Sequence, residues 1–369
     1  MNKLKKIYNF LIHKKWNIPN NPRGGGRFIL SEFIDDYRKH ELPFYQIHKI
    51  HKRGFFVSDW AYFKLNEQNY KDYLSNVQYY AMHPINGWNT IWIDDKLTLK
   101  YMCAGTELDK FMPKYYFQTD KETNLIALPD SPVKCDDLDW HSIISLLKKE
   151  KEIAVKRISG SAGEGFYRAY YDNNKFYLNK DVYSEEEFLL KLKRLPNYIY
   201  TEYLRPHKDL APFCDETVNS IRYLVARIDG HFELVTSFIR FGTLKSNYVD
   251  NYLAGGVLCF CDEYGHFDKG NVIDHSTGTN IEVSSHPDNN LRLEGVIPNW
   301  NLIIEAVKAF DDHFPQLSYL GFDFAITDKN EAKIIEINSL SGIHSLQLRG
   351  SILDSRFRDF FTSKLTYKY

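Results

Sequence analysis

The stretch Gly321-Phe-Asp-Phe-Ala-Ile-Thr-Asp-Lys-Asn-Glu-Ala-Lys-Ile-Ile-Glu-Ile-Asn338 has the alternation of two β-strands joined by a tight turn. We expect a hairpin with the two-residue loop Lys329-Asn330, which places Asp323 directly opposite Glu336. Cβ atoms in such a cross-strand pair are about 5 Å apart. Because side chains alternate along a strand, Asn338 joins these carboxylates on one face. The other face is apolar and is expected to pack, with Phe322, Phe324, Ile335 and Ile337.

The polar face of this hairpin forms a set of oxygen donors. Two facing carboxylates repel each other unless a proton or a cation lies between them. Carboxylate and amide oxygens suit Mg²⁺ that bridges nucleotide phosphates. A solvated acidic face is the alternative, but it requires neither a packed opposite face nor a carboxylate matched across the turn. The hairpin therefore predicts a magnesium site at Asp323, Glu336 and Asn338.

A second candidate site lies at residues 153–168, where small residues follow a strand. The segment reads Ile-Ala-Val-Lys-Arg-Ile-Ser-Gly-Ser-Ala-Gly-Glu-Gly-Phe-Tyr-Arg, with Lys156 before the glycines. A P-loop has its lysine after the glycines and continues as a helix, whereas an alternating strand follows here. Backbone N–H groups of such a loop can form an anion nest, to which Lys156 adds a positive charge. Taken alone, the segment fits a phosphate-binding loop and an ordinary hairpin equally well.

The rest of the chain mixes strand and helix patterns. Residues 1–90 are expected to be mainly helical, with a mobile glycine loop at 24–26, and a strand at 92–96 is expected to run into a helix. Further strands are predicted at 153–156, 166–171, 198–202, 221–228, 232–240, 321–327 and 332–338, and helices at 141–150, at 184–194, from Pro298 and at the C-terminal end. This order predicts an α+β fold with mostly antiparallel sheets.

The composition is that of a globular chain of 369 residues, long enough for two or three packed lobes. The aromatic content of 15% suits half-polar clefts, but AT-rich coding explains it equally well. A net charge of −1 gives no global field directed at nucleic acid, so we expect no nucleic-acid partner. The five cysteines have no metal-ligand or paired spacing, which favours a reducing cytoplasm. No apolar run approaches the roughly 20 residues of a membrane span.

The N-terminal sixty residues are basic, with twelve Lys or Arg and five Asp or Glu residues. Within residues 1–16, apolar side chains fall on one side of a predicted helix and lysines on the others. Such a helix can rest on an anionic membrane, and a helix docked on its own domain is the alternative. The basic start lacks the apolar length and cleavage site of a signal peptide. We expect a cytoplasmic protein. Whether residues 1–16 also contact the inner face of the cytoplasmic membrane stays open.

In this order, the motifs resemble the layout of the ATP-grasp superfamily. The chain is most similar to the sugar-transfer-associated branch, including the teichuronopeptide-synthesis type. The resemblance covers residues 90–350 and rests on 95–97, 155–156 with the glycine loop, 200–204, 218–222, 249–256, 286–288, 297–300 and 321–338. It implies two α+β lobes with mostly antiparallel sheets that grip ATP: an N-lobe at 91–200 with the glycine loop and a C-lobe at 201–369 with the metal site. Residues 1–90 would form an additional helical segment.

The resemblance also implies roles for single residues. Lys96 and Lys156 would bind nucleotide phosphates, and Arg222 would act with Lys156 on the reacting phosphate or acyl phosphate. The remaining ATP contacts would be Ser159, Gly160, Ser161, Gly163, Gly165, Asn219 and the hinge segment Glu202, Tyr203 and Leu204, which would grip adenine. The substrate contacts would be Asp250, Asn251, Gly255, Gly256, Ser341 and His344. Glu164 departs from the pattern, because an acid in the glycine loop is less common than a small or basic residue.

The implied activity is ATP-dependent ligation, in which a carboxylate is phosphorylated and an amine attacks the acyl phosphate. The branch implies a role in biosynthesis of a cell-surface polysaccharide of the capsule, O-antigen or teichuronic type. A uronic-acid sugar or glycan and an amino acid or amine would be the substrates, and which one is activated stays open. A sugar or small-molecule kinase on the same fold is one alternative. A non-catalytic nucleotide-binding module of a polysaccharide assembly complex is another, which the complete set of lysines, arginine and carboxylates argues against.

Overall fold

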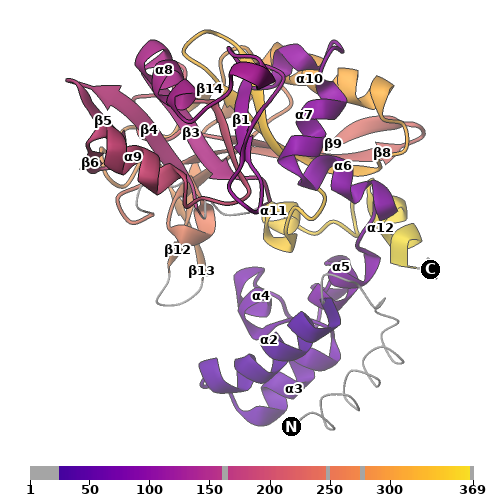
Figure 1. The fold of residues 1–369 in the computed structure, drawn as a ribbon. Coiled ribbons are helices and arrows are strands. Elements are labelled where there is room, and N and C mark those ends of the chain that lie inside the picture. The colour runs from indigo at the N-terminus through magenta and orange to yellow at the C-terminus, as the bar shows by residue number, and fades with distance from the viewer. Residues whose placement is uncertain (1–24, 160–164, 247–249, 275–278, 366–369) are drawn as a thin grey trace, which may run out of the picture.

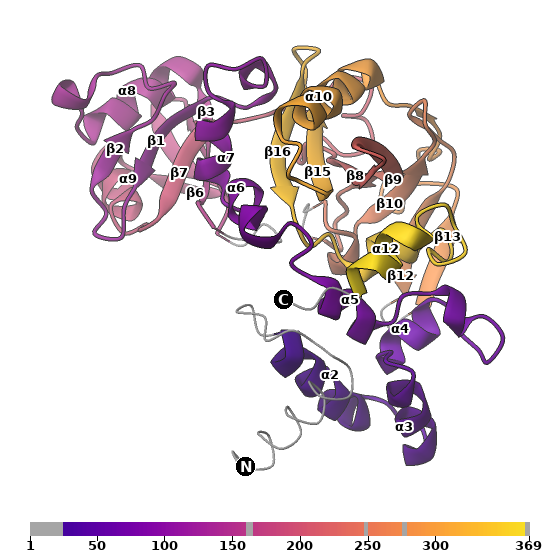
Figure 2. The same ribbon diagram turned by 90° about the vertical axis from the view of Figure 1, so that its right-hand side faces the viewer.

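The computed structural model describes residues 25–159, 165–246, 250–274 and 279–365. Segment 1–16, with its predicted membrane contact, and the predicted ATP contacts Gly160, Ser161 and Gly163 lie outside these ranges. Two seven-stranded sheets stand side by side, and helices from the N-terminal end pack below the second (Figure 1 and Figure 2). Every named strand pair in the described ranges is antiparallel, so the predicted α+β class with antiparallel sheets is confirmed.

The first sheet is formed by residues 115–202, with strand order β2-β1-β7-β3-β4-β5-β6. Its elements are β1 (Tyr115–Thr119), β2 (Leu125–Ala127), α8 (His141–Glu150), β3 (Glu152–Arg157), β4 (Tyr167–Asp172), β5 (Lys175–Leu178), β6 (Asp181–Tyr183), α9 (Glu185–Leu192) and β7 (Tyr198–Glu202). Helices α8 and α9 cover one face, where Ile153 and Val155 are buried among their apolar side chains. Side chains alternate along β3, so Lys156 lies on the opposite face.

The second sheet has strand order β13-β12-β10-β9-β8-β15-β16. Its strands are β8 (Ile221–Ile228), β9 (His231–Phe241), β10 (Val257–Cys261), β12 (Gly270–Asp274), β13 (Thr279–Val283), β15 (Tyr319–Ile326) and β16 (Ala332–Asn338). Helix α10 (Trp300–His313) packs on one face, where the ring centroids of Phe310 and Phe322 are 5.2 Å apart. The remaining elements of this region are β11 (His266–Phe267), β14 (Gly295–Val296), α11 (Ile343–Gln347) and α12 (Arg358–Leu365).

The N-terminal helices pack against the other face of the second sheet. They are α2 (Gly25–Lys39), α3 (Phe44–Lys52), α4 (Val57–Tyr62) and α5 (Asn76–Met82). Phe63, just after α4, shares an apolar cluster with Phe238 of β9 and Leu258 of β10. The amide of Asn86 donates to the Tyr319 carbonyl at 2.7 Å and so joins this region to β15. The predicted limits 1–90, 91–200 and 201–369 stay a prediction, although the two sheets fall at 115–202 and 221–338.

Two local predictions are wrong. The expected strand at 92–96 is helical, as α6 (Ile91–Asp94) and the start of α7 (Lys96–Cys103). Asp95 caps α7 by accepting the Thr98 backbone N–H at 2.8 Å. Its own backbone N–H donates to the Ile91 carbonyl at 3.4 Å and so closes the single turn of α6. The expected mobile loop at 24–26 is wrong for its described part, because α2 already begins at Gly25.

The hairpin between β15 and β16 has a three-residue loop where two residues were predicted. Thr327 donates its backbone N–H to the Glu331 carbonyl at 2.9 Å, which closes a loop of residues 328–330. Asn330 has a φ of 59°, in the left-handed region that asparagine tolerates better than most residues. The predicted loop Lys329-Asn330 is therefore one residue too short.

A β-bulge compensates for the longer loop. Asp323 still pairs with Glu336, as predicted, but the register shifts by one residue before Phe324, which pairs with Ile334. Ile334 is fully buried with Phe324, whereas Ile335 is half-buried and outside that cluster. The prediction that Ile335 lies on the packed face is wrong for this reason. Asp323 and Glu336 keep the predicted register because the bulge lies between this pair and the turn.

The other predicted strands and helices are present at the expected places within a few residues. Short 3₁₀ segments connect them at Tyr70–Asp72, Gly87–Thr90, Asp109–Phe111, Cys135–Asp137 and Tyr252–Ala254. Among the described helices, none combines the length and the hydropathy that crossing a membrane requires.

Candidate active site

The polar face of the β15–β16 hairpin brings the predicted metal ligands together. Asp323 and Glu336 are directly paired across the strands. The Asn338 side-chain amide donates to Asp323 Oδ2 at 3.2 Å and to Glu336 Oε1 at 3.3 Å. Asp323 is buried, while Glu336 and Asn338 are half-buried. The face therefore presents two carboxylates and one amide as a contiguous group.

Two arginines surround Asp323. Arg222 of β8 donates from Nε and Nη2 to its two carboxylate oxygens at 2.7 and 2.9 Å. Arg240 of β9 donates to Asp323 Oδ1 at 2.8 Å and to the Ser220 hydroxyl at 2.6 Å. Burial alone would raise the pKa of Asp323, but the charges of Arg222 and Arg240 hold it below its usual range. Asp323 is therefore an ionised carboxylate with a fixed orientation.

The oxygen atoms of Asp323, Glu336 and Asn338 are of the type that Mg²⁺ prefers, but hydrogen bonds already occupy Asp323. No group of three or more His, Cys, Asp or Glu side chains forms a metal cluster in the described ranges, so the predicted site depends on two carboxylates and one amide oxygen. Hydrogen bonds from Arg222, Arg240 and Asn338 reach both oxygens of Asp323. A carboxylate offers about four acceptor positions. A metal ion at Asp323 would therefore have to replace at least one of these donors.

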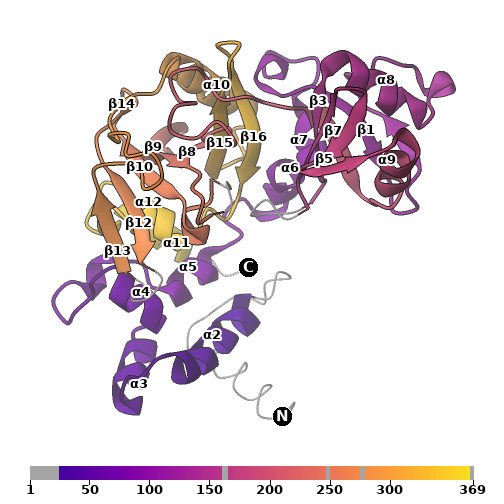
Figure 3. The same ribbon diagram turned by 90° about the vertical axis from the view of Figure 1, so that its left-hand side faces the viewer.

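Lys96 connects the helices between the sheets to this hairpin. As the first residue of α7 it is buried, and its Nζ lies 3.2 Å from Glu336 Oε2. Asp94 of α6 accepts the backbone N–H and the hydroxyl of Ser339, just after β16, at 2.8 and 2.7 Å. Figure 3 shows α6 and α7 between β16 and the strands of the first sheet. The predicted nucleotide lysine thus lies beside the predicted metal ligands.

Lys156 reaches the same region from the first sheet. Its Nζ lies 5.8 Å from the centroid of the buried Tyr115 ring. Burial and the charge of Lys96 lower the pKa of Lys156 to about 8, and the charge of Glu336 offsets part of this effect. The Tyr115 hydroxyl is buried and finds no hydrogen-bond partner among the described residues. The two predicted nucleotide lysines are therefore close enough to influence each other.

The ends of the glycine loop are anchored near the lysines. The Ser159 hydroxyl donates to Asp95 Oδ2 at 3.2 Å, which ties the start of the loop to the cap of α7. Gly165 has a φ of 72°, and a Cβ atom there would lie 2.6 Å from the Tyr198 hydroxyl and 2.9 Å from Arg157 Nε. The positive φ and the two close side-chain ends favour glycine at this end of the loop.

The predicted hinge residues lie between the lobes, but the Glu202 carboxylate is already engaged. Lys329, in the hairpin loop, donates to Glu202 Oε1 at 2.6 Å. Burial alone would raise the pKa of Glu202, but the hydrogen bond and the charge of Lys329 hold it below its ordinary value. Leu204 is half-buried at the end of the same segment. The carboxylate thus links the two sheets, and its predicted contact with adenine stays a prediction.

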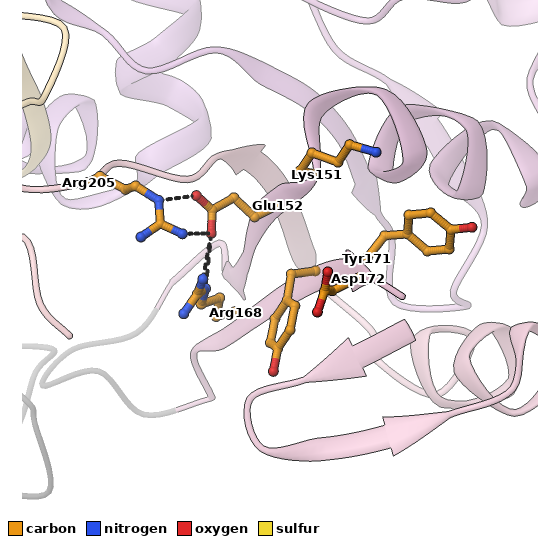
Figure 4. Close-up of a pocket in the computed structure, with 7 residues that line it drawn as sticks. Lys151, Glu152, Arg168, Tyr171, Asp172 and Arg205 are labelled. Carbon is orange, nitrogen blue, oxygen red and sulfur yellow. Dashed lines mark hydrogen bonds and ion pairs between the residues drawn. The ribbon is translucent and has the colours of Figure 1, made fainter. Parts of the chain in front are cut away.

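A depression of about 280 Å³ lies beside the hinge (Figure 4). In it, Glu152 accepts hydrogen bonds from Arg168 at 3.0 Å and from Arg205 at 2.5 and 2.9 Å. The guanidinium groups of these arginines lie 5.1 and 5.9 Å from the centroid of the Tyr203 ring. Two arginines thus share one glutamate, so this group carries one net positive charge. The depression adjoins the candidate site and does not contain its lysines or carboxylates.

The side chain of Asn219 forms hydrogen bonds within the protein, so its geometry does not support the predicted contact with ATP. It is fully buried with a φ of 51°. Its amide nitrogen donates to the carbonyl groups of Leu210 and Cys214 at 3.0 and 2.8 Å, and its amide oxygen accepts from the Thr217 hydroxyl at 3.0 Å. The side chain therefore braces the chain before β8.

The predicted substrate residues of segment 250–256 form a turn beside β8. Asp250 Oδ2 accepts the Ser220 backbone N–H at 2.8 Å, and the Asn251 carbonyl accepts the Gly256 backbone N–H at 3.0 Å. Gly255 has a φ of 107°, and a Cβ atom on Gly256 would lie 2.9 Å from the Phe241 carbonyl oxygen. The glycines are thus explained by backbone geometry.

The predicted substrate residues after β16 lie on either side of the turn into α11. The Ser341 carbonyl accepts a hydrogen bond from Arg222 Nη1 at 3.5 Å. The Ser341 hydroxyl lies so close to Gly321 that a Cβ atom on Gly321 would be only 1.9 Å from it. The His344 Nε2 lies 2.6 Å from Asp59 Oδ1 of α4. Ser341 therefore belongs to the arginine–carboxylate group, whereas His344 meets the N-terminal helices.

The sequence interpretation missed three charged residues, Arg240, Asp94 and Asp59. Each acts through a partner far away in the sequence: Arg240 through Asp323, Asp94 through Ser339 and Asp59 through His344. No local motif marks them, and only the strand order and the docking of the helices bring them to the site.

Comparison with known proteins identifies the family. The sequence model of the sugar-transfer associated ATP-grasp family matches residues 76–360. No curated protein sequence matches the chain. The D-alanyl-alanine synthetase A of Vibrio cholerae O1 biovar eltor is 12% identical over 76% of this chain and 65% of that chain, with a TM-score of 0.42. The L-amino acid ligase of Bacillus licheniformis is 6% identical over 70% of this chain and 43% of that chain, with a TM-score of 0.35.

A third solved structure, N5-carboxyaminoimidazole synthetase of Staphylococcus aureus complexed with ADP, is 13% identical over 67% of this chain and 44% of that chain, with a TM-score of 0.35. The chain spans less than two thirds of the length of each of these solved proteins. At such identities and scores the likenesses carry no argument about activity. The family match covers well over half of the chain and confirms the predicted resemblance. The chain therefore belongs to the sugar-transfer associated ATP-grasp family.

Proposed function

We propose that this protein is an ATP-dependent carboxylate–amine ligase of cell-surface polysaccharide biosynthesis. It joins a uronic-acid-bearing sugar to an amino acid or amine and releases ADP and phosphate. A carboxylate oxygen of the sugar attacks the γ-phosphorus of ATP, and ADP leaves. The amine nitrogen then attacks the acyl carbon, the phosphate departs with that carboxylate oxygen, and the amine loses a proton.

The observation that carries this proposal is the meeting of opposite charges where the two sheets face each other. Lys156 comes from the first sheet, Lys96 from α7 and Arg222 from the second sheet. They surround the Asp323–Glu336 pair, which is directly matched across β15 and β16. Cations beside oxygen ligands suit a triphosphate and its divalent ion, and such a site catalyses by positioning and charge neutralisation.

Each group has a defined part in this proposal. Lys96 and Lys156 bind and neutralise phosphate oxygens, and Arg222 stabilises the negative charge that develops during transfer. Asp323, Glu336 and Asn338 hold Mg²⁺, which supplies further charge neutralisation at the phosphates when bound. A metal ion at Asp323 would take the place of at least one of its present hydrogen-bond donors, which come from Arg222, Arg240 and Asn338.

The two cysteines in β10 argue against a mechanism with a cysteine nucleophile. Cys259 and Cys261 are buried in β10, and burial raises the pKa of each thiol. A thiol that stays protonated is a poor nucleophile. The proposed reaction needs no enzyme nucleophile, which agrees with this arrangement.

An isotope experiment tests the reaction. Uronic acids carrying ¹⁸O in the carboxylate are incubated with ATP, Mg²⁺ and a panel of amino acids and amines, and the released phosphate is analysed by mass spectrometry. We expect one ¹⁸O atom in inorganic phosphate for each amide formed. ADP release that is indifferent to every amine, with a stable phosphorylated sugar as product, would replace the ligase by a kinase. An Asp323→Asn variant controls for contaminating ATPases.

We also propose that the protein works in the cytoplasm, with residues 1–16 resting on the inner membrane face. The support is the basic character of residues 1–60 and the amphipathic pattern of residues 1–16. Co-sedimentation with anionic vesicles is expected for the full chain and not for a chain lacking residues 1–16. Equal sedimentation of the two chains would end this part of the proposal.

A further inference from the structure

Helix α4 contacts both loops that carry predicted substrate residues. Its Asp59 Oδ1 lies 2.6 Å from Nε2 of His344 in α11. Its Tyr62 hydroxyl donates to the Tyr252 hydroxyl at 3.2 Å, in the turn of residues 250–256. Figure 1 shows α4 below α11, on the side of the molecule where the N-terminal helices meet the second sheet. One short helix thus reaches two loops that are far apart in the sequence.

The Asp59–His344 pair is firmly held on the aspartate side. Asp59 is buried, and its second oxygen accepts a hydrogen bond from the side-chain amide of Asn76. The rings of Tyr62 and Phe63 lie 4.8 and 5.9 Å from the imidazole, centroid to centroid. His344 itself remains 32% exposed. A fixed carboxylate and two aromatic rings therefore set the position of a half-exposed imidazole.

The same contacts favour a charged His344. Burial alone would lower the pKa of His344, but the hydrogen bond and charge of Asp59 raise it above its ordinary value. A protonated imidazole has an N–H group on each ring nitrogen. With Nε2 directed at Asp59, Nδ1 carries the second donor.

Both loops are connected to the arginines around Asp323. In the loop of His344, the Ser341 carbonyl accepts from Arg222 Nη1 at 3.5 Å. In the loop of Tyr252, Asp250 holds the backbone N–H of Ser220, whose hydroxyl accepts from Arg240 at 2.6 Å. Each loop is therefore within one or two hydrogen bonds of the candidate reaction centre.

We propose that α4 forms one wall of the sugar site, where Asp59 positions His344 as a cation that binds the carboxylate of a hexuronic acid. Tyr62 and Phe63 are buried and pack against the imidazole, so they fix its orientation, and Tyr62 also holds the Tyr252 turn in place. A charge-assisted hydrogen bond from imidazolium to carboxylate supplies discrimination against neutral sugars. This inference rests on the proposed function, because the two loops are substrate loops only if the protein acts on a carboxylate sugar. Asp59 acts through His344 and is a positioning residue.

Histidine NMR tests the proposal without requiring turnover. The full-length protein is labelled at histidine, and the His344 signal is identified by its loss in His344→Gln. We expect glucuronate or galacturonate to shift this signal and glucose to leave it unchanged. In Asp59→Asn the titration midpoint of His344 should fall, and uronate affinity should weaken about tenfold or more, as expected for a lost charged hydrogen bond.

A second histidine–aspartate pair provides the matched control. His51 Nε2 lies 2.8 Å from Asp36 Oδ2 in the same helical region, and Asp36 also accepts the backbone N–H of Val57 at the start of α4. Asp36→Asn should leave the His344 signal and the uronate affinity unchanged. Equal weakening by Asp36→Asn and Asp59→Asn would show a merely structural effect and overturn the proposal, as would a His344 signal that ignores both uronates.

The outcome for this site can be separated from the outcome for the ligase reaction. Uronate binding at His344 without amine-dependent phosphate release would support the site and overturn the ligase reaction. Amide formation from a uronic acid with an unresponsive His344 signal would support the reaction and overturn the site.

Discussion

The two sides of the candidate active site carry their charges differently. On the second sheet, Asp323 is held by Arg222 and Arg240 through bonds of 2.7 to 2.9 Å. On the first sheet, Lys156 lies over the Tyr115 ring, and burial together with the charge of Lys96 lowers its pKa to about 8. The charges of Asp323, Arg222 and Arg240 compensate each other, so removing one of them should cost stability. The charge of Lys156 is disfavoured by burial, and an anionic ligand would compensate it. We therefore expect substitutions on the two sides to separate stability from nucleotide binding.

The largest effect is expected for Asp323→Asn. This change leaves the buried Arg222 and the half-buried Arg240 without their carboxylate, and breaking a buried ion pair from one side costs about 3 kcal/mol or more. Urea unfolding should show this loss, and ADP release should fall to background. Glu336→Gln is the matched control, because the Glu336 side chain is 25% exposed and contacts one lysine and the Asn338 amide in place of two arginines, so its stability loss should be clearly smaller. Equal stability of both variants with the wild type would contradict the contrast between the two sides.

Lys156→Met should weaken ATP binding without lowering the stability of the ligand-free protein. Loss of a charged hydrogen bond to phosphate should weaken ATP binding by about 1–3 kcal/mol. The unfolding free energy of the ligand-free protein should stay the same or rise, because a desolvated ammonium group is removed. Calorimetry with ATP and urea unfolding without it measure the two quantities. A destabilised ligand-free protein with unchanged ATP affinity would reverse the comparison.

The pH dependence sharpens the same point. Because the pKa of Lys156 is about 8 in the folded protein and 10.5 in its ordinary state, the unfolded chain binds more protons between these values. The free energy of unfolding should therefore rise with pH over this window relative to Lys156→Met. Phosphates favour the charged lysine, so ATP binding should take up a proton and weaken up to about tenfold per pH unit above pH 8. Calorimetry in buffers of different ionisation enthalpy detects the proton, and its absence in the wild type would contradict the placement of Lys156.

The smallest effect is expected where the two sheets meet at the hinge. Lys329 is 62% exposed, so its ion pair with Glu202 should contribute only about 0.5–1 kcal/mol to stability. A double-mutant cycle with Glu202→Gln and Lys329→Ala measures this coupling. If Glu202→Gln alone weakens ATP binding while Lys329→Ala does not, the carboxylate also meets adenine. Equal effects of the two changes would restrict Glu202 to joining the lobes.

Much of the core of the site followed from local patterns. The alternation of residues along 321–338 predicted that Asp323 would face Glu336 with Asn338 beside them, and the structure confirms it. The prediction succeeded despite a loop one residue too short, because the bulge before Phe324 restores the register. A bulge has no clear local sequence signal here, so Ile335 was assigned to the wrong face.

The sequence by itself determined the elements whose cause is local: the period-two strands and the helices with an apolar face at 3.6-residue spacing, such as α10. Only the tertiary structure decided which distant charges meet. Arg240 reaches Asp323 because β8 lies between β9 and β15 in the sheet. Asp59 reaches His344 because the N-terminal helices bury their apolar side chains against the same sheet. Such contacts depend on strand order and on helix docking, which the burial of whole faces selects and no short motif encodes.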